Sequence, residues 1–205
     1  MTDHAVTTVD ALYDLYKLPK QSVRDKVLGA LDIHCRDFIR NCPFLVIGTH
    51  GADGGTDTSP RGDAPGFVDV LDDTTVLLPD RPGNNRLDTL RNIVGNPAVG
   101  LLFMIPGLRE TLRINGKATV STDPELLARA VVQGKTPLTT LKIDVTEAYL
   151  HCGKAIIRSH LWEQAARIDL KSLPTAAEIY ADQIGGLKVE EMEQVLKTSY
   201  ETTLY

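Results

Sequence analysis

The stretch DTSPRGDAPGF, residues 57–67, places the hydroxyl of Ser59, the guanidinium of Arg61 and the carboxylate of Asp63 on one short segment. Proline fixes its backbone φ and lacks an N–H donor, so Pro60 is expected to end a strand. A second proline–glycine pair follows at Pro65–Gly66. A packed core does not require such a row of polar groups. The pattern predicts a stiff turn with a role outside the core.

Short strand patterns lie on both sides of this turn. They are FLVIGTH, TDTS, GFVDVL, TTVLLP, AVGLLFMI, ETLRINGKATVST and TTLKIDVTEAYLHC, and most are joined by hairpin-length turns. Such short strands favour a closed or split antiparallel barrel of about six strands. A doubly wound fold would need regular strand–helix alternation and a glycine fingerprint, and the sequence has neither.

Helical patterns flank the strands. The first forty residues are expected to be helical, with a capping box at Ser22 and Asp25 and an apolar face ending near Pro43. The pattern of residues 84–97 predicts a short helix. The C-terminal tail, residues 175–205, predicts two helices broken at Gly185–Gly186. The apolar residues of that tail predict that its helices pack on the barrel. We expect one domain over 1–205, with N-terminal helices over 1–42, a core over 43–165 and C-terminal helices over 166–205.

Composition excludes several classes of protein. The net charge of −5 argues against a nucleic-acid binder, and no apolar run approaches the roughly 18 residues that a membrane span needs. The N-terminal stretch lacks the pattern of a signal peptide. The three cysteines form no CxxC pair and are interpreted as reduced thiols, and the five histidines show no metal-ligand spacing. A cytoplasmic protein without a metal site is expected.

The segment PDRPGNNRLD, residues 79–88, is the best candidate for an anion site. A helix is expected to begin near Asn84, and a helix N-terminus offers free N–H groups and a partial positive charge. Arg81 and Arg86 add full charges that can bind phosphate oxygens through two hydrogen bonds. The alternative is that Asn84 is a plain N-cap and that both arginines are solvated.

Two further basic pairs stand four residues apart, Arg109 with Arg113 on a predicted strand and Lys154 with Arg158 on a short predicted helix. Each pair would share one face of its element. For both, an exposed basic surface is an alternative to a binding role.

The order of these motifs resembles a known family. SPRGD, then LLPDRPGNNRLDTLRNIVGNPAVGLLFMIPG, TLRINGKA and the late HCGKAIIRSHLW are similar to the pyridoxamine 5'-phosphate oxidase-like proteins, over roughly residues 40–165. The match is closest to a subgroup described only as FMN-dependent enzymes. The resemblance implies a mainly β fold with flanking helices, a six-stranded antiparallel split β-barrel. It also implies a homodimer with FMN at the subunit interface.

The resemblance also implies a set of cofactor-binding residues. These are Ser59, Arg61 and Asp63, then Arg81, Asn84, Asn85 and Arg86 for the phosphate, Met104 on a strand along the ring, and Arg113, Lys154 and Arg158 from the same or the partner subunit.

The function that follows is an FMN-dependent oxidoreductase acting on a small-molecule substrate, with NAD(P)H as a candidate electron donor. No residue is singled out as a catalytic acid or base. A flavin-binding carrier or sensor without turnover, and a haem-handling split-barrel protein, are the alternatives. The acidic tail differs from the arginine-rich end of pyridoxamine-phosphate oxidases, so pyridoxamine phosphate is not the expected substrate.

Overall fold

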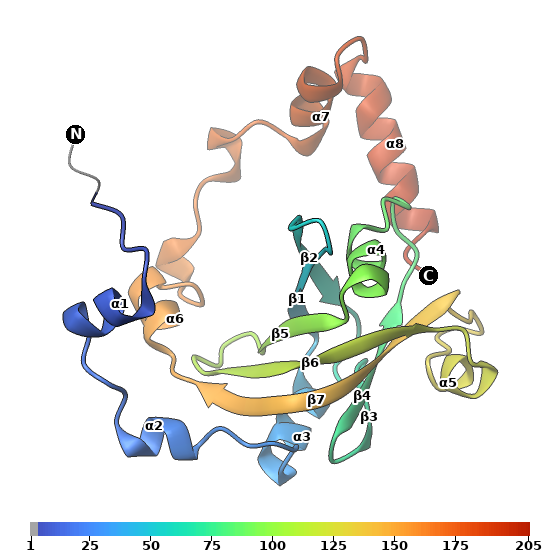
Figure 1. Ribbon diagram of the computed structural model, residues 1–205. Helices are drawn as coiled ribbons and strands as arrows, with labels where there is room; N and C mark the ends of the chain where they lie inside the picture. Colours follow the sequence, from blue (N-terminus) through green and yellow to red (C-terminus); the bar gives the residue numbers. More distant parts are fainter. Residues whose placement is uncertain (1–3) are drawn as a thin grey trace.

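A seven-stranded antiparallel sheet forms the centre of the computed structural model, which describes residues 4–205 (Figure 1). The first three residues of the N-terminal stretch lie outside the described residues. The strand order across the sheet is β2-β1-β5-β6-β7-β4-β3. The strands are β1 (Phe44–His50), β2 (Thr56–Gly62), β3 (Asp69–Asp72), β4 (Thr75–Asp80), β5 (Ala98–Met104), β6 (Thr111–Ser121) and β7 (Thr139–His151).

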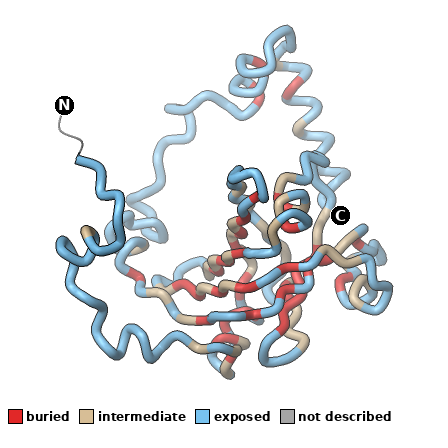
Figure 2. Tube along the Cα trace, viewed as in Figure 1, coloured by how far each residue is buried: buried red, intermediate tan, exposed pale blue. Residues whose placement is uncertain are grey.

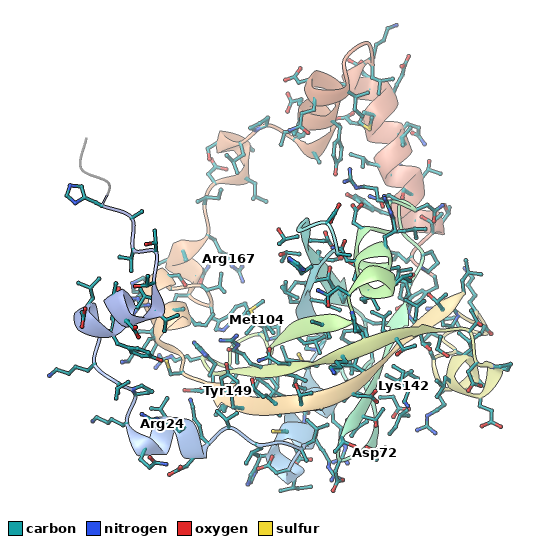
Figure 3. All side chains as sticks on the ribbon, viewed as in Figure 1. Arg24, Asp72, Met104, Lys142, Tyr149 and Arg167 are labelled. Atoms are coloured by element: carbon teal, nitrogen blue, oxygen red, sulfur yellow. The ribbon has the colours of Figure 1, made fainter. Side chains whose placement is uncertain are left out.

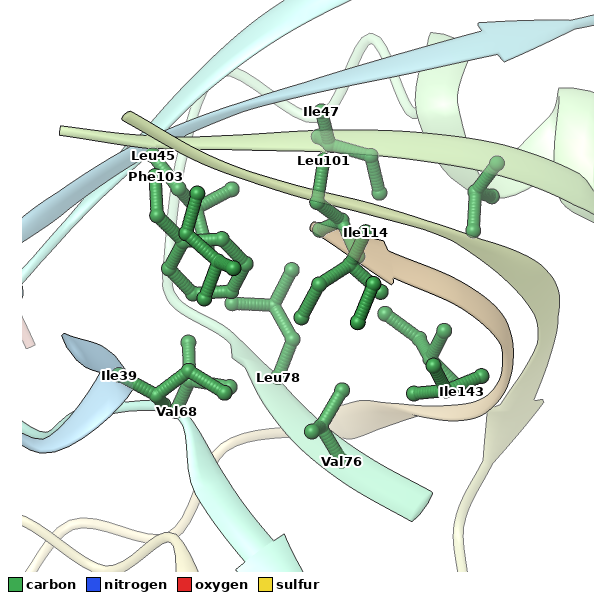
Figure 4. Close-up of a cluster of buried hydrophobic side chains, with 14 of the residues drawn as sticks. Ile39, Leu45, Ile47, Val68, Val76, Leu78, Leu101, Phe103, Ile114 and Ile143 are labelled. Carbon is green, nitrogen blue, oxygen red and sulfur yellow. The ribbon is translucent and has the colours of Figure 1, made fainter. Parts of the chain in front are cut away.

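The sheet curls around one hydrophobic core. Leu45 of β1, Phe103 of β5 and Leu78 of β4 are buried in the same cluster (Figure 4). Strands so far apart in the sheet can share a core only if the sheet bends. The sheet does not close, because β2 and β3 remain its two edges. The predicted mainly β split barrel with flanking helices is confirmed, with seven strands in place of six.

The difference of one strand concerns the two edges of the sheet, where the strand patterns in the sequence are weak. β3 has only four residues, and β2 is polar along most of its length. β2 also continues through Pro60, which lies opposite Val46 of β1, so the predicted strand end at Pro60 is wrong. An edge strand is hydrogen-bonded on one side only, and proline is tolerated there.

The long pair β6 and β7 carries a β-bulge between Asn115 and Gly116. A side chain at Gly116 would collide with the backbone oxygen of Asp144 on the neighbouring strand. The glycine is therefore needed for the close approach of two backbones.

Gly116→Ala should destabilise the protein by about 1–3 kcal/mol, because the added methyl group forces the two strands apart. Urea unfolding measures the change. Gly29→Ala is the matched control, since nothing lies within 4 Å of a Cβ there. Equal stability of the two variants would contradict the prediction.

Residues 4–205 contain eight α-helices: α1 (Val9–Leu15), α2 (Gln21–Asp25), α3 (Ile33–Asn41), α4 (Asp88–Gly95), α5 (Pro124–Arg129), α6 (Lys154–Ser159), α7 (Ala176–Ile184) and α8 (Val189–Thr202). Two 3-10 turns, Gln164–Ala166 and Leu170–Ser172, precede α7. None of the helices in residues 4–205 is long and apolar enough to cross a lipid bilayer.

The N-terminal segment is less regular than its sequence pattern predicts. Leu28 forms a β-bridge to Ala148 of β7, and this extended piece separates α2 from α3. Ser22 is not a cap, because α2 begins after Lys20 without a side-chain cap. Asp32 caps α3 instead and accepts a hydrogen bond from the Cys35 amide at 2.8 Å. Here the pairing of Leu28 with β7 outweighs the helical spacing of the apolar residues.

The C-terminal tail does form two helices broken at Gly185–Gly186, and both glycines have left-handed φ angles. The two helices pack on each other through small buried side chains such as Ala181 and the buried Met192. Figures 1 and 2 show this hairpin standing away from the sheet. Ile184 and Val195 are exposed. The prediction that these apolar residues pack on the barrel is therefore wrong for a single copy of the chain.

Candidate functional site

A cleft of about 1230 Å³ lies between β2, the end of β4, the segment that leads into α4, and residues 135–139, which lead into β7. Its volume slightly exceeds the range of about 300–1,000 Å³ that is usual for small-molecule sites. Phe67, Leu87, Leu90 and Leu138 supply apolar surface. The cationic side chains of the lining are Arg61, Arg81, Arg86 and Lys135.

Two crossed ion pairs join the strands at this cleft. Arg61 of β2 contacts Asp80 of β4 with 2.6 Å between Nη1 and Oδ1. Arg81, which follows β4, contacts Asp63, which follows β2, with 2.8 Å between Nε and Oδ2. All four side chains are less than one fifth exposed. The SPRGD motif therefore connects β2 and β4, two strands that are not neighbours in the sheet.

Asp63 is the most buried member of this group. Its Oδ1 accepts hydrogen bonds from the Tyr205 hydroxyl and the Ala64 amide, both at 2.7 Å. Burial by itself raises the pKa of Asp63, but these hydrogen bonds and the nearby Arg81 outweigh it, so the pKa lies below its ordinary value. Asp63 is held as a carboxylate.

The lowered pKa of Asp63 predicts a pH dependence of stability. In the unfolded chain an aspartate has a pKa of about 3.9. The stabilising contribution of Asp63 is therefore present above that pH and is lost as the pH falls through its lower folded-state pKa. Urea unfolding at several pH values below 6 measures this. The stability difference between wild type and Asp63→Asn should shrink as the solution is acidified below about pH 4. Asp182→Asn, at an exposed position, is the control. A difference that stays constant with pH would refute the assignment.

The segment before α4 differs from its prediction. Asn85 and Leu87 have left-handed φ angles of 59° and 60°, so α4 begins at Asp88 and not near Asn84. The Asn84 side chain accepts a hydrogen bond from the Arg86 amide at 3.1 Å and stabilises a turn. Arg86 therefore precedes the helix and does not lie in its first turn.

Arg86 is the most exposed arginine of the cleft. Its side chain is 74% exposed, and its Nε donates to Asp88 at 2.8 Å. An exposed ion pair of this kind contributes only about 0–1 kcal/mol. Arg86 can therefore exchange its partner for a ligand anion at little cost, whereas Arg61 and Arg81 are fixed by largely buried pairs.

The structure brings together part of the predicted set. Ser59, Arg61, Arg81, Asn84, Asn85 and Arg86 all line the cleft. Asp63 is not part of the cleft lining but accepts a hydrogen bond from Arg81, which is.

The other four predicted residues lie outside the cleft lining of this chain: Met104, Arg113, Lys154 and Arg158. Figure 3 shows Met104 and Tyr149 toward the α6 end of the sheet. The Arg113 guanidinium lies over the Tyr149 ring, 5.3 Å from its centre. Lys154 and Arg158 belong to α6 itself.

Sequence reasoning missed several residues of the cleft. Lys135, Leu138, Thr139 and Tyr205 line it from segments distant from SPRGD in the chain. The Thr139 hydroxyl is buried and has no hydrogen-bond partner among residues 4–205, and the same holds for Nε of Arg61. No motif marks these residues. The pairing of β4 with β7 places Thr139 opposite Asp80, and the hydrogen bond of the Tyr205 hydroxyl to Asp63 brings the C-terminal segment to the cleft.

The fold and the cleft define a mainly β, split-barrel class of protein with a mixed apolar and cationic site. The family model described as pyridoxamine 5'-phosphate oxidase matches residues 31–152, more than half of the 205 residues. The chain therefore belongs to the pyridoxamine 5'-phosphate oxidase family. Among curated proteins, no sequence matches significantly.

Several solved structures are similar to this chain. HupZ of Group A Streptococcus is 18% identical with a TM-score of 0.49, covering 58% of this chain and 93% of that one. A candidate pyridoxamine 5'-phosphate oxidase of Lactobacillus delbrueckii is 17% identical with a TM-score of 0.48, covering 60% and 95%. An F420 reductase is 16% identical with a TM-score of 0.40, covering 57% and 94%.

Proposed function

We propose that the protein binds FMN in this cleft and acts as an oxidoreductase on a small molecule. Membership of the pyridoxamine 5'-phosphate oxidase family supports a flavin cofactor. The observation that carries the proposal is the make-up of the cleft, where apolar side chains and four cationic ones share one cavity. A planar apolar ring system with an anionic tail needs both kinds of surface.

The residues present fit such a cofactor. Leu87 and Leu90 offer apolar contacts, and Ser59, Asn84 and Asn85 offer hydroxyl and amide groups for a polar chain. Within residues 4–205 the buried Nε of Arg61 and the hydroxyl of Thr139 have no hydrogen-bond partner, so two polar groups at the cleft wall remain to be satisfied.

When bound, FMN would supply the redox chemistry, and the chain would bind and orient it. Arg86 would hold the phosphate, because its own side chain is exposed and its pair with Asp88 is easily exchanged. Arg61 and Arg81 would keep the walls of the cleft in place through their pairs with Asp80 and Asp63.

A flavin carrier or sensor is a second candidate. The acidic side chains of the cleft are all engaged: Asp80 and Asp88 pair with arginines, and Asp57 accepts a hydrogen bond from Thr89 at 2.6 Å. No free carboxylate stands ready as a proton donor or acceptor in the lining that the structure describes. Oxidation of NADH or NADPH by the FMN-loaded protein would distinguish an enzyme from a carrier.

Arg86→Ala should weaken FMN binding by about ten- to a hundredfold, because a charge-assisted phosphate contact contributes about 1.5–3 kcal/mol. Fluorescence titration with FMN measures this, and riboflavin should bind wild type and variant almost equally because it has no phosphate. Arg91→Ala removes a cation of α4 that is not part of the cleft lining and is the matched control.

FMN binding by Arg86→Ala at wild-type strength would place the phosphate elsewhere, with Arg61 and Arg81 next in line. An absorption spectrum of the purified protein comes first. A Soret band in place of flavin bands would favour the haem-handling alternative and overturn the FMN proposal.

We also propose that the protein is a homodimer with the cofactor near the interface. Two segments are largely exposed, α1 with the residues after it and α6 with the residues after it (Figure 2). Their exposed large apolar side chains are Leu12, Tyr13, Leu15, Tyr16, Leu18, Ile157, Leu161 and Trp162. Exposed apolar groups gathered in this way are typical of protein contact surfaces. A second copy would cover them, and would offer Lys154 and Arg158 to a cleft other than their own.

Sedimentation equilibrium should give twice the chain mass of 22.4 kDa. Leu12→Glu combined with Tyr16→Glu, which places charge on the exposed N-terminal surface, should shift the protein toward the monomer. A wild-type monomer that holds FMN at full occupancy would rule out the interface site.

A further inference from the structure

Tyr205 joins three separate parts of the cleft. Its hydroxyl donates to Asp63 Oδ1 at 2.7 Å. The Arg81 guanidinium lies over its ring, 5.7 Å from the centre. Its backbone oxygen accepts a hydrogen bond from Lys135 Nζ at 2.7 Å. Asp63 follows β2, Arg81 follows β4, and Lys135 precedes β7, so one residue contacts three of the four segments that border the cleft.

These contacts stand out against the rest of the C-terminal segment. The other residues from 201 to 204 are exposed, and only Tyr205 is partly buried. The α7–α8 hairpin stands clear of the sheet, while the chain after α8 returns to the cleft next to the segment that precedes α4 (Figure 1). Thr203 and Tyr205 both contribute to the cleft lining.

The arginine that Tyr205 contacts is held from several directions. Its Nε donates to Asp63 at 2.8 Å and its Nη1 to the Ala130 carbonyl at 2.8 Å. The Tyr205 ring lies next to the guanidinium. Nη2 has no hydrogen-bond partner in the part of the chain that the structure describes and retains donors for an anion.

We propose that Tyr205 is a positioning residue of the cofactor cleft, which fixes the Arg81–Asp63 pair so that Arg81 presents its remaining donors to the phosphate end of the cofactor. The proposal rests on the proposed FMN site. The ring and the hydroxyl act separately, because the ring meets the cation and the hydroxyl meets the carboxylate. By thermodynamic linkage, docking of Tyr205 and binding of the cofactor strengthen each other by the same factor.

The test uses three variants of the full chain. Tyr205→Phe keeps the ring over Arg81 and loses the hydrogen bond to Asp63, and Tyr205→Ala loses both. Tyr200→Ala removes an exposed tyrosine of α8 that does not line the cleft, and serves as the matched control.

FMN affinity should fall about three- to tenfold in Tyr205→Phe and about tenfold or more in Tyr205→Ala, with riboflavin affected less and Tyr200→Ala unchanged. Hydrogen exchange of α8 should slow on adding FMN to the wild type, and this slowing should vanish in Tyr205→Ala.

A second measurement needs no flavin. The Nε–H signal of Arg81 in a ¹⁵N NMR spectrum reports on its hydrogen bond to Asp63, and it should exchange faster with water in Tyr205→Phe than in wild type. Unchanged exchange in both Tyr205 variants would overturn the proposal whether or not FMN binds. Should the wild type fail to bind FMN, the function assigned to the cleft falls, and this signal still decides whether Tyr205 holds Arg81. Wild-type FMN affinity in Tyr205→Ala, beside a loss in Arg86→Ala, would also overturn it.

Discussion

The crossed ion pairs Arg61–Asp80 and Arg81–Asp63 hold together β2 and β4, two strands that are not paired with each other in the sheet. β2 is an edge strand, and β4 lies near the opposite edge, so no backbone hydrogen bond spans the gap between them. Side chains must therefore make the connection. Because the pairs are largely buried, removing one partner would leave a charge in a poorly solvated place, at a cost of about 3–5 kcal/mol. The shape of the cleft depends on this connection.

The cleft combines rigid and exchangeable charges. Arg61 and Arg81 are held by largely buried ion pairs with Asp80 and Asp63, while Arg86 is exposed and weakly paired. The cationic and acidic side chains nearly balance, so the cleft does not attract anions through net charge alone. A phosphate would instead be recognised by arginine donors that are already oriented, or that change partner from carboxylate to phosphate with similar geometry.

Both ends of the chain extend beyond the curled sheet. The helices α1 and α8 expose apolar side chains such as Leu12 and Val195, which a second copy of the chain would be suited to cover. The C-terminal segment differs from the N-terminal one because Tyr205 brings it back to the cleft. A tail that is otherwise anchored weakly can then respond to what the cleft holds.

The sequence by itself determined the class of fold, the break at Gly185–Gly186 and the identity of the polar motifs around Arg61 and Arg81. These features depend on local rules: alternation marks a strand, glycine permits left-handed backbone, and proline restricts φ. Only the tertiary structure decided that Pro60 lies within an edge strand, that α4 begins at Asp88, and that Arg61 and Arg81 face carboxylates. It also decided that Lys135 and Tyr205 reach the cleft. These outcomes depend on which distant strands pair and on how far the sheet curls, and a contact across 142 positions of sequence, such as that of Tyr205 with Asp63, leaves no local pattern to read.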